Sequence, residues 1–171
     1  AFMGGVTRRF PDLRMAFLEG GVGWACTLYS DLIGRWKKRN RTQVQNYNPA
    51  NLDRELFFDL HRRYGGNLVE GRLNSERDRN LAMYRNPAGL QQEDPETLDD
   101  FARCGISRPE DIRDLFVPNF YFGCEADDPI NAWAFDSKKN PYGAKLRAIF
   151  GSDIGHFDVP DMREASAEAY E

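Results

Sequence analysis

Three short apolar segments of the sequence alternate with stretches of helical periodicity. Residues 13–18, 120–124 and 146–152 each have the length and composition of a strand and run into a polar loop. After the first segment, apolar residues recur at every fourth position, which indicates one face of an amphipathic helix. That face consists of Trp24, Leu28, Leu32 and Trp36, and Tyr29 and Ile33 widen it. Strands that alternate with helices are typical of parallel βαβ units. The sequence therefore predicts an α/β fold with parallel strands, in which residues 13–18 form a buried strand.

A second helix is expected between Asn48 and Gly65. Asn48 suits the N-cap and Pro49 the first helical position, while Gly65 and Gly66 end the helix. Its apolar face repeats every four residues, at Leu52, Leu56, Leu60 and Tyr64. Residues 66–93 are polar and show little periodicity, so they are expected to form a long surface excursion.

Shorter helical signals follow in the second half of the chain. Residues 94–105 begin with Asp-Pro and end with glycine, which is typical of a short helix. Ser107 and Glu110 have the S-x-x-E spacing of a capping box, which opens another helix. A further helix is expected over residues 130–135, and a last one begins at Pro160.

The composition excludes several classes of protein. The chain has 171 residues, of which 41% are hydrophobic and 13% aromatic, so it can form a core and is not disordered. It contains no apolar run of the ~20 residues needed to cross a bilayer, so no membrane is expected as a partner. Its three cysteines are widely spaced and form no CxxC motif, which argues against disulfides and cysteine-based zinc sites. A reduced, cytoplasmic location is therefore expected.

The positive charge of the chain is concentrated in residues 35–41, which contain Arg35, Lys37, Lys38, Arg39 and Arg41. Such a cluster can bind nucleic acid. However, cations also complement the dipole at a helix C-terminus, and the chain as a whole has a net charge of -4. We therefore interpret the cluster as a solvated helix end and expect no nucleic-acid partner.

Each predicted strand is followed by an acidic residue: Glu19, Glu125 and Asp153. In parallel α/β folds the carboxyl ends of the strands share one edge, where the chemistry takes place. Three carboxylates at such an edge can bind a metal or act as acid and base. For Glu125 the alternative is a structural role at the start of the next helix, since Asp127 and Asp128 are residues of the helix-capping type.

Asp153 is the stronger candidate because it follows Gly151 and Ser152, whose small size allows a ligand to approach closely. His156 comes three residues later and is a candidate for acid–base catalysis. The alternative for His156 is a structural hydrogen bond. His61, in the middle of a predicted helix beside Arg62, is interpreted as a surface residue or one at the edge of the core.

Two motifs resemble those of a known family. The segment RFPDLR (residues 9–14), which leads to LEGG (18–21), and the segment FGSDIGH (150–156) are similar to the amidohydrolase superfamily. The closest resemblance is to the amidohydrolase-related branch that contains aminocarboxymuconate-semialdehyde decarboxylase. This resemblance implies a (β/α)8 TIM barrel whose sixth, seventh and eighth strands correspond to the three predicted strands. Residues 1–171 would then be a partial, C-terminal barrel domain, since a whole barrel needs about 250 residues.

The resemblance also implies a site. The family holds one divalent metal, often zinc, with a His-x-His motif on the first strand, a histidine on the fifth and the aspartate of the eighth. Asp153 corresponds to that aspartate and would be both metal ligand and catalytic base. The family's catalytic histidine on the sixth strand corresponds to Glu19, and this difference leaves the type of reaction open. A carboxylate can accept a proton, but it cannot act as a neutral imidazole does.

Three functions are compatible with these residues. The first is a metal-dependent hydrolase that acts on a small carboxylated or aromatic substrate, with this chain as an incomplete fragment that is itself inactive. The second is a metal-dependent, non-oxidative decarboxylase on the same scaffold. The third is a small non-enzymatic interaction module, which would need a closed apolar core, whereas a partial barrel leaves strand edges and apolar helix faces open. A homo-oligomer of the full-length enzyme is compatible with the first two.

Overall fold

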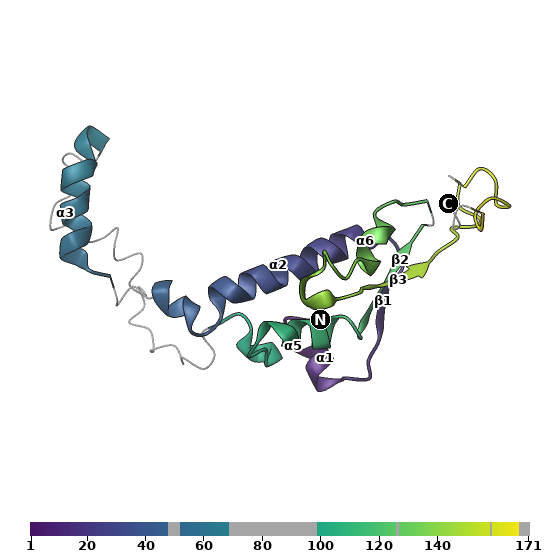
Figure 1. Ribbon diagram of the computed structural model, residues 1–171, viewed down its shortest axis with the longest axis horizontal. Helices are drawn as coiled ribbons and strands as arrows, with labels where there is room; N and C mark the ends of the chain where they lie inside the picture. Colours follow the sequence, from purple (N-terminus) through teal and green to yellow (C-terminus); the bar gives the residue numbers. More distant parts are fainter. Residues whose placement is uncertain (48–51, 69–98, 126, 158, 168–171) are drawn as a thin grey trace. The chain divides into compact units, whose positions relative to one another are not determined.

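The structure is a computed structural model that describes residues 1–47, 52–68, 99–125, 127–157 and 159–167 (Figure 1). The chain divides into two compact units. One comprises Ala1–Asn40 together with Asp100–Glu171, and the other comprises Arg41–Asp99. The sheet and all of the predicted site residues belong to the first unit.

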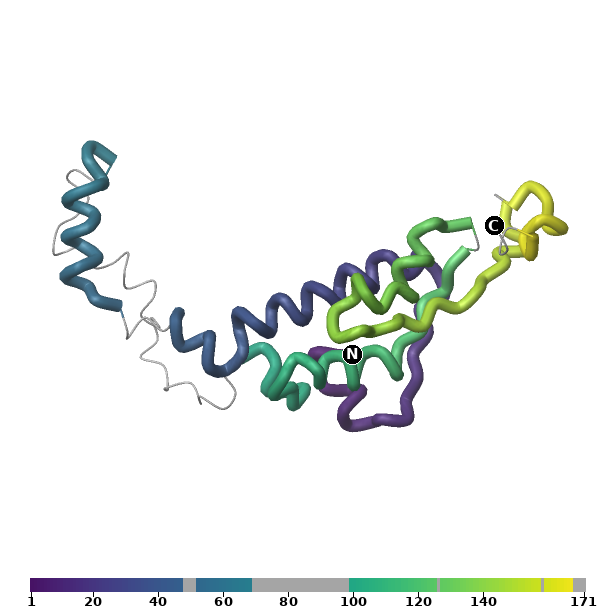
Figure 2. The backbone as a smooth tube through the Cα atoms, viewed as in Figure 1, coloured from purple at the N-terminus to yellow at the C-terminus, as the bar shows by residue number. Residues whose placement is uncertain are grey.

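The first unit is built on a sheet of three parallel strands. These are β1 (Met15–Phe17), β2 (Phe120–Cys124) and β3 (Arg147–Phe150), and they lie side by side in chain order (Figure 2). Both strand pairs, β1 with β2 and β2 with β3, are parallel. The prediction of an α/β fold with neighbouring parallel strands is therefore confirmed.

One face of the sheet is covered by helices. Side chains two residues apart in a strand point to the same face, so Phe17, Phe120 and Phe122 all place their rings on this face. Helix α2 (Gly23–Arg39) contributes Trp24, whose ring lies 5.3 Å from that of Phe122. Helix α5 (Pro109–Phe116) contributes Phe116, whose ring lies 5.0 Å from that of Phe120. The core of the unit is this aromatic layer, in which Phe122 is only 1% exposed.

The opposite face of the sheet is open among the described residues. Ala16, Tyr121 and Arg147 lie at one level of the three strands, and their side chains alternate onto this face. Ala16 and Arg147 are exposed and Tyr121 is half-buried. The Arg147 guanidinium lies 5.0 Å from the centre of the Tyr121 ring and donates a hydrogen bond to its hydroxyl. The described part of the first unit thus forms two layers, with helices over one side of a sheet.

The prediction that residues 13–18 form a buried strand is wrong. The strand is limited to Met15–Phe17, with Phe17 42% and Leu18 74% exposed. The reason is topological: β1 is an outer strand that pairs only with β2 among the described elements. Its apolar side chains would be covered only by a further strand, a further layer or a partner.

Two close contacts hold β1 against β2. At the start of the pair, the buried Asn119 side chain donates from Nδ2 to the carbonyl oxygens of Pro11 (3.0 Å) and Leu13 (2.8 Å). At the other end, the backbone of Leu18 passes directly over Gly123. A Cβ on Gly123 would lie 2.6 Å from the Leu18 carbonyl carbon and still closer to its oxygen, so only glycine fits there.

The predicted helix on the Trp24–Trp36 stripe is confirmed as α2, which ends at the basic cluster with Lys37, Lys38 and Arg39 in its last turn. The short helix at 130–135 is confirmed as α6 (Asn131–Phe135). Shorter elements are α1 (Val6–Arg9) and the 3-10 turns η5 (Ala102–Cys104) and η6 (Pro141–Gly143). Among the described residues, none of the helices has the length and apolar character needed to cross a membrane.

Two predicted helix starts in the first unit need correction. The capping box of α5 is closed by Asp111 and not by Glu110: Asp111 Oδ2 accepts from the backbone N–H groups of Ser107 (2.9 Å) and Arg108 (3.1 Å). The helix expected from Pro160 is absent over residues 159–167, which form turns. There the Asp161 carboxylate accepts from the Arg163 backbone N–H at 3.0 Å and so offers the backbone an alternative to a helix.

The second unit contains α3 (Arg54–Tyr64) between the 3-10 turns η1 (Gln43–Tyr47) and η3 (Gly66–Leu68). Its predicted start at Pro49 is wrong. Leu52 and Asp53 are not helical, and Asp53 is the N-cap, with a carboxylate that accepts from the Leu56 N–H at 2.9 Å. The helix ends at Gly65, as predicted.

Some predictions fall outside the described residues. Residues 48–51 include the predicted N-cap, and residues 69–98 include most of the expected surface excursion and the first part of the helix predicted over 94–105. The segment predicted as a helix over 94–105 ends at Gly105, which has a φ of 65°, in the left-handed region that glycine adopts readily.

Candidate functional site

The parallel sheet brings three predicted site residues to one edge. Glu19 comes two residues after β1, Glu125 directly follows β2, and Asp153 comes three residues after β3. Neighbouring strands lie about 4.8 Å apart, so the ends of β1 and β3 are separated by roughly 10 Å. The prediction that the three strands end at a common acidic edge follows from this topology.

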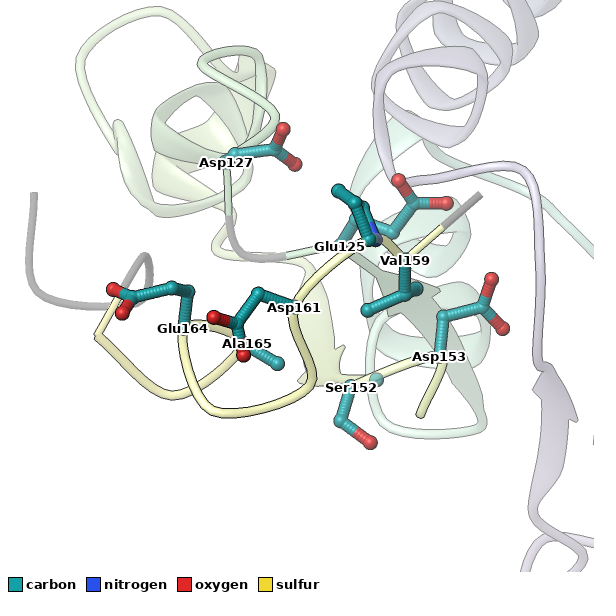
Figure 3. Close-up of a pocket in the computed structure, with 10 residues that line it drawn as sticks. Glu125, Asp127, Ser152, Asp153, Val159, Asp161, Glu164 and Ala165 are labelled. Atoms are coloured by element: carbon teal, nitrogen blue, oxygen red, sulfur yellow. The ribbon is translucent and has the colours of Figure 1, made fainter. Parts of the chain in front are cut away.

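A depression of about 340 Å³ lies at the ends of β2 and β3 (Figure 3). It is strongly acidic, with side chains of Glu125, Asp127, Asp153, Asp161 and Glu164 around it. It is also lined by Gly151 and Ser152, the two small residues that precede Asp153. The structure therefore brings Glu125 and Asp153 together, whereas Glu19 and His156 are not among the residues that line this depression.

Asp153 occupies an unusual backbone conformation. Its φ is 49°, in the left-handed region that aspartate and asparagine tolerate better than most residues. The turn is closed by a 3.0 Å hydrogen bond from the His156 backbone N–H to the Asp153 carbonyl oxygen. This conformation turns the chain back on itself directly after the strand, so that Asp153 and His156 meet.

The side chains of Asp153 and His156 form a carboxylate–imidazole pair. His156 Nδ1 lies 3.3 Å from Asp153 Oδ2, and both side chains are partly exposed to solvent. With its proton on Nδ1, the imidazole donates to the carboxylate, and Nε2 becomes the basic nitrogen of the ring. Sequence spacing alone suggested only that His156 was within reach of the same edge; the left-handed turn is what joins the two groups.

The structure also addresses the structural alternatives. The Ile154 N–H donates to Ser152 Oγ at 3.4 Å, and the Asp153 carboxylate contacts His156 across the same turn, so both side chains support it. In the β2–α6 loop, Asp128 Oδ1 accepts from the Ile130 N–H at 3.0 Å, as expected for a residue of the helix-capping type. The Glu125 carbonyl oxygen accepts from Asn131 Nδ2 at 2.6 Å and closes the same loop.

Two residues of the depression were missed by the sequence analysis. Asp161 and Glu164 were assigned to a helix, whereas the turns at 159–167 place them around the same depression as Asp153. Asp161 is bound to Arg163, with Nη2 2.7 Å from Oδ2, and these hydrogen bonds lower the pKa of its carboxyl. The Pro160-Asp161 pair is a turn signal that could have indicated this arrangement.

The metal site implied by the resemblance is not completed by the described residues. Among them, no three His, Cys, Asp or Glu side chains are grouped to hold an ion, and the labelled carboxylates in Figure 3 point in different directions. Cys26, Cys104 and Cys124 are free and buried. Burial raises the pKa of Cys26 and Cys124, which disfavours the thiolate form that binds metals. Asp153 would therefore contribute one carboxylate to a site that needs further ligands.

His61 lies on α3, in the second of the two units. Its Nδ1 lies 2.8 Å from the Phe57 carbonyl oxygen, one turn earlier in the helix. This contact agrees with the structural interpretation of His61. Comparisons of the chain with family models, with curated proteins and with solved structures find no match.

Proposed function

We propose that β1, β2 and β3 form part of the wall of an amidohydrolase-type (β/α)8 barrel, as its sixth, seventh and eighth strands. The open face of the sheet carries this proposal. A parallel sheet that stands alone is normally covered on both faces, whereas a barrel wall has helices outside and its own interior on the other side. The unpaired outer edges of β1 and β3 support the same proposal, because in a complete barrel both edges would be paired with further strands.

Exposed apolar side chains support a partial barrel over the interaction module. Phe17, Trp24 and Leu28 are each about 40% exposed and line one hollow at the aromatic layer. A self-contained module of this size would bury such side chains in a closed core. In a barrel, they would be covered by the preceding strand and its helix.

The activity that we propose is hydrolysis of a small carboxylated or aromatic compound in a metal-dependent enzyme. Asp153 accepts the proton of the attacking water, and the Nδ1–H of His156 holds its carboxylate in place. Glu19, at the end of β1, adds a second anionic proton acceptor at the same edge. The zinc or other divalent ion expected from the resemblance would need ligands beyond the described residues, so proton transfer is assigned to this chain's own carboxylate.

The experiment compares two aspartates of the same depression in the longest natural form of the protein. Asp153→Asn keeps the shape of the side chain and removes its basicity. We expect a rate loss of roughly 10²–10⁴-fold, typical of a lost general base, with an unchanged melting temperature. Asp161→Asn is the matched control, because its carboxylate is engaged with Arg163.

Two families of substrate separate the reaction types. Aryl esters and amides report hydrolysis, and carboxylated aromatic compounds report decarboxylation through release of CO₂. Near-normal turnover in Asp153→Asn would refute the catalytic assignment, and CO₂ release without hydrolysis would replace the hydrolase by the decarboxylase. If Asp153 had only a capping role, Asp153→Asn would retain its activity, whereas Asp153→Ala would lose about 1 kcal/mol of stability.

A further inference from the structure

No further inference is drawn: the strongest candidate, the apolar hollow at the aromatic layer of the first unit, lined by Phe17, Trp24 and Leu28, supports no particular occupant, because nothing in the described part of the structure shows what covers it.

Discussion

Gly123→Ala should loosen the β1–β2 pair and destabilise the first unit. A Cβ at this position would lie 2.6 Å from the Leu18 carbonyl carbon and 2.9 Å from its Cα, whereas real Cβ contacts are almost never closer than 3.0 Å. The Leu18 backbone must therefore retreat by at least about 0.4 Å, the difference between 2.6 and 3.0 Å. Because the obstacle is backbone, it cannot move aside by changing a rotamer.

Overpacking of this kind costs about 1–3 kcal/mol. For a chain of this size each kcal/mol shifts the melting temperature by about 2–4 °C, so we expect a decrease of about 2–12 °C. Differential scanning calorimetry measures this decrease. Gly34→Ala is the control, since a Cβ on Gly34 of α2 meets no atom within 4 Å and should stabilise the helix by roughly 0.5–1 kcal/mol. Equal melting temperatures for Gly123→Ala and the unmodified chain would refute the close approach of β1 to β2.

Four further predictions follow from particular contacts. Asn119→Ala should cost about 1–3 kcal/mol in urea denaturation, because two loop carbonyls lose their buried donor. Burial alone would raise the pKa of Asp111, but the hydrogen bonds that it accepts hold it below the usual value. The ionised Asp111 carboxylate therefore stabilises the fold above pH about 4, and this stabilisation is lost as the pH falls through the folded pKa. Asp111→Asn should remove this loss from the acid denaturation curve. Burial raises the pKa of Tyr29 to about 12, so the stability of the fold should decrease as the pH rises from about 10 towards 12. Tyr29→Phe should not show this decrease at alkaline pH, although it loses the hydrogen bond to the Pro141 carbonyl oxygen. Elemental analysis of the purified 171-residue chain should find no stoichiometric zinc, since the proposed site would have Asp153 as only one of about three protein ligands that zinc needs; one ion per chain that survives dialysis against a chelator would contradict this.

The elements that sequence predicted well are those with a strong local signal. Strand β2 occupies the predicted residues because an apolar run of five is bounded by polar residues on both sides. Helix α2 follows its stripe of period four and ends at the basic cluster. In both cases the pattern located the element but not its buried side: Trp24 and Leu28 of the α2 stripe are about 40% exposed, whereas Ala25 and Cys26 outside the stripe are buried.

The helix starts were harder because several residues compete for the same role. Asn48 and Asp53 are both good N-caps, and the structure uses Asp53. Glu110 and Asp111 are adjacent carboxylates, and the one that reaches back to Ser107 is Asp111. Such choices depend on the direction of a side chain within a single turn, which the spacing of residue types does not specify.

The candidate site was predictable only in part because it is assembled by turns. The order of parallel strands was enough to place Glu19, Glu125 and Asp153 at one edge. The pairing of Asp153 with His156 depends on a left-handed residue, and the presence of Asp161 depends on a turn that replaces a helix. The left-handed residue is one that local propensity disfavours. The turn, in contrast, has a local signal in Pro160 and Asp161, which competes with the helix signal of the same residues.

Asp153→Asn can separate catalysis from folding because its structural cost is small. Asparagine adopts the left-handed conformation at least as readily as aspartate, so a φ of 49° remains acceptable, whereas alanine would add strain. Two carboxylates about 5 Å apart in water repel by only about 0.8 kcal/mol, so removing one charge from the acidic edge should slightly stabilise the fold. The loss of the His156 contact is of similar size, since both groups are partly exposed. These contributions nearly cancel, whereas a 10²–10⁴-fold loss of rate corresponds to roughly 3–5 kcal/mol in the activation barrier. A large decrease in rate with an unchanged melting temperature would therefore report the chemistry of the Asp153 carboxylate and not the stability of the turn that holds it.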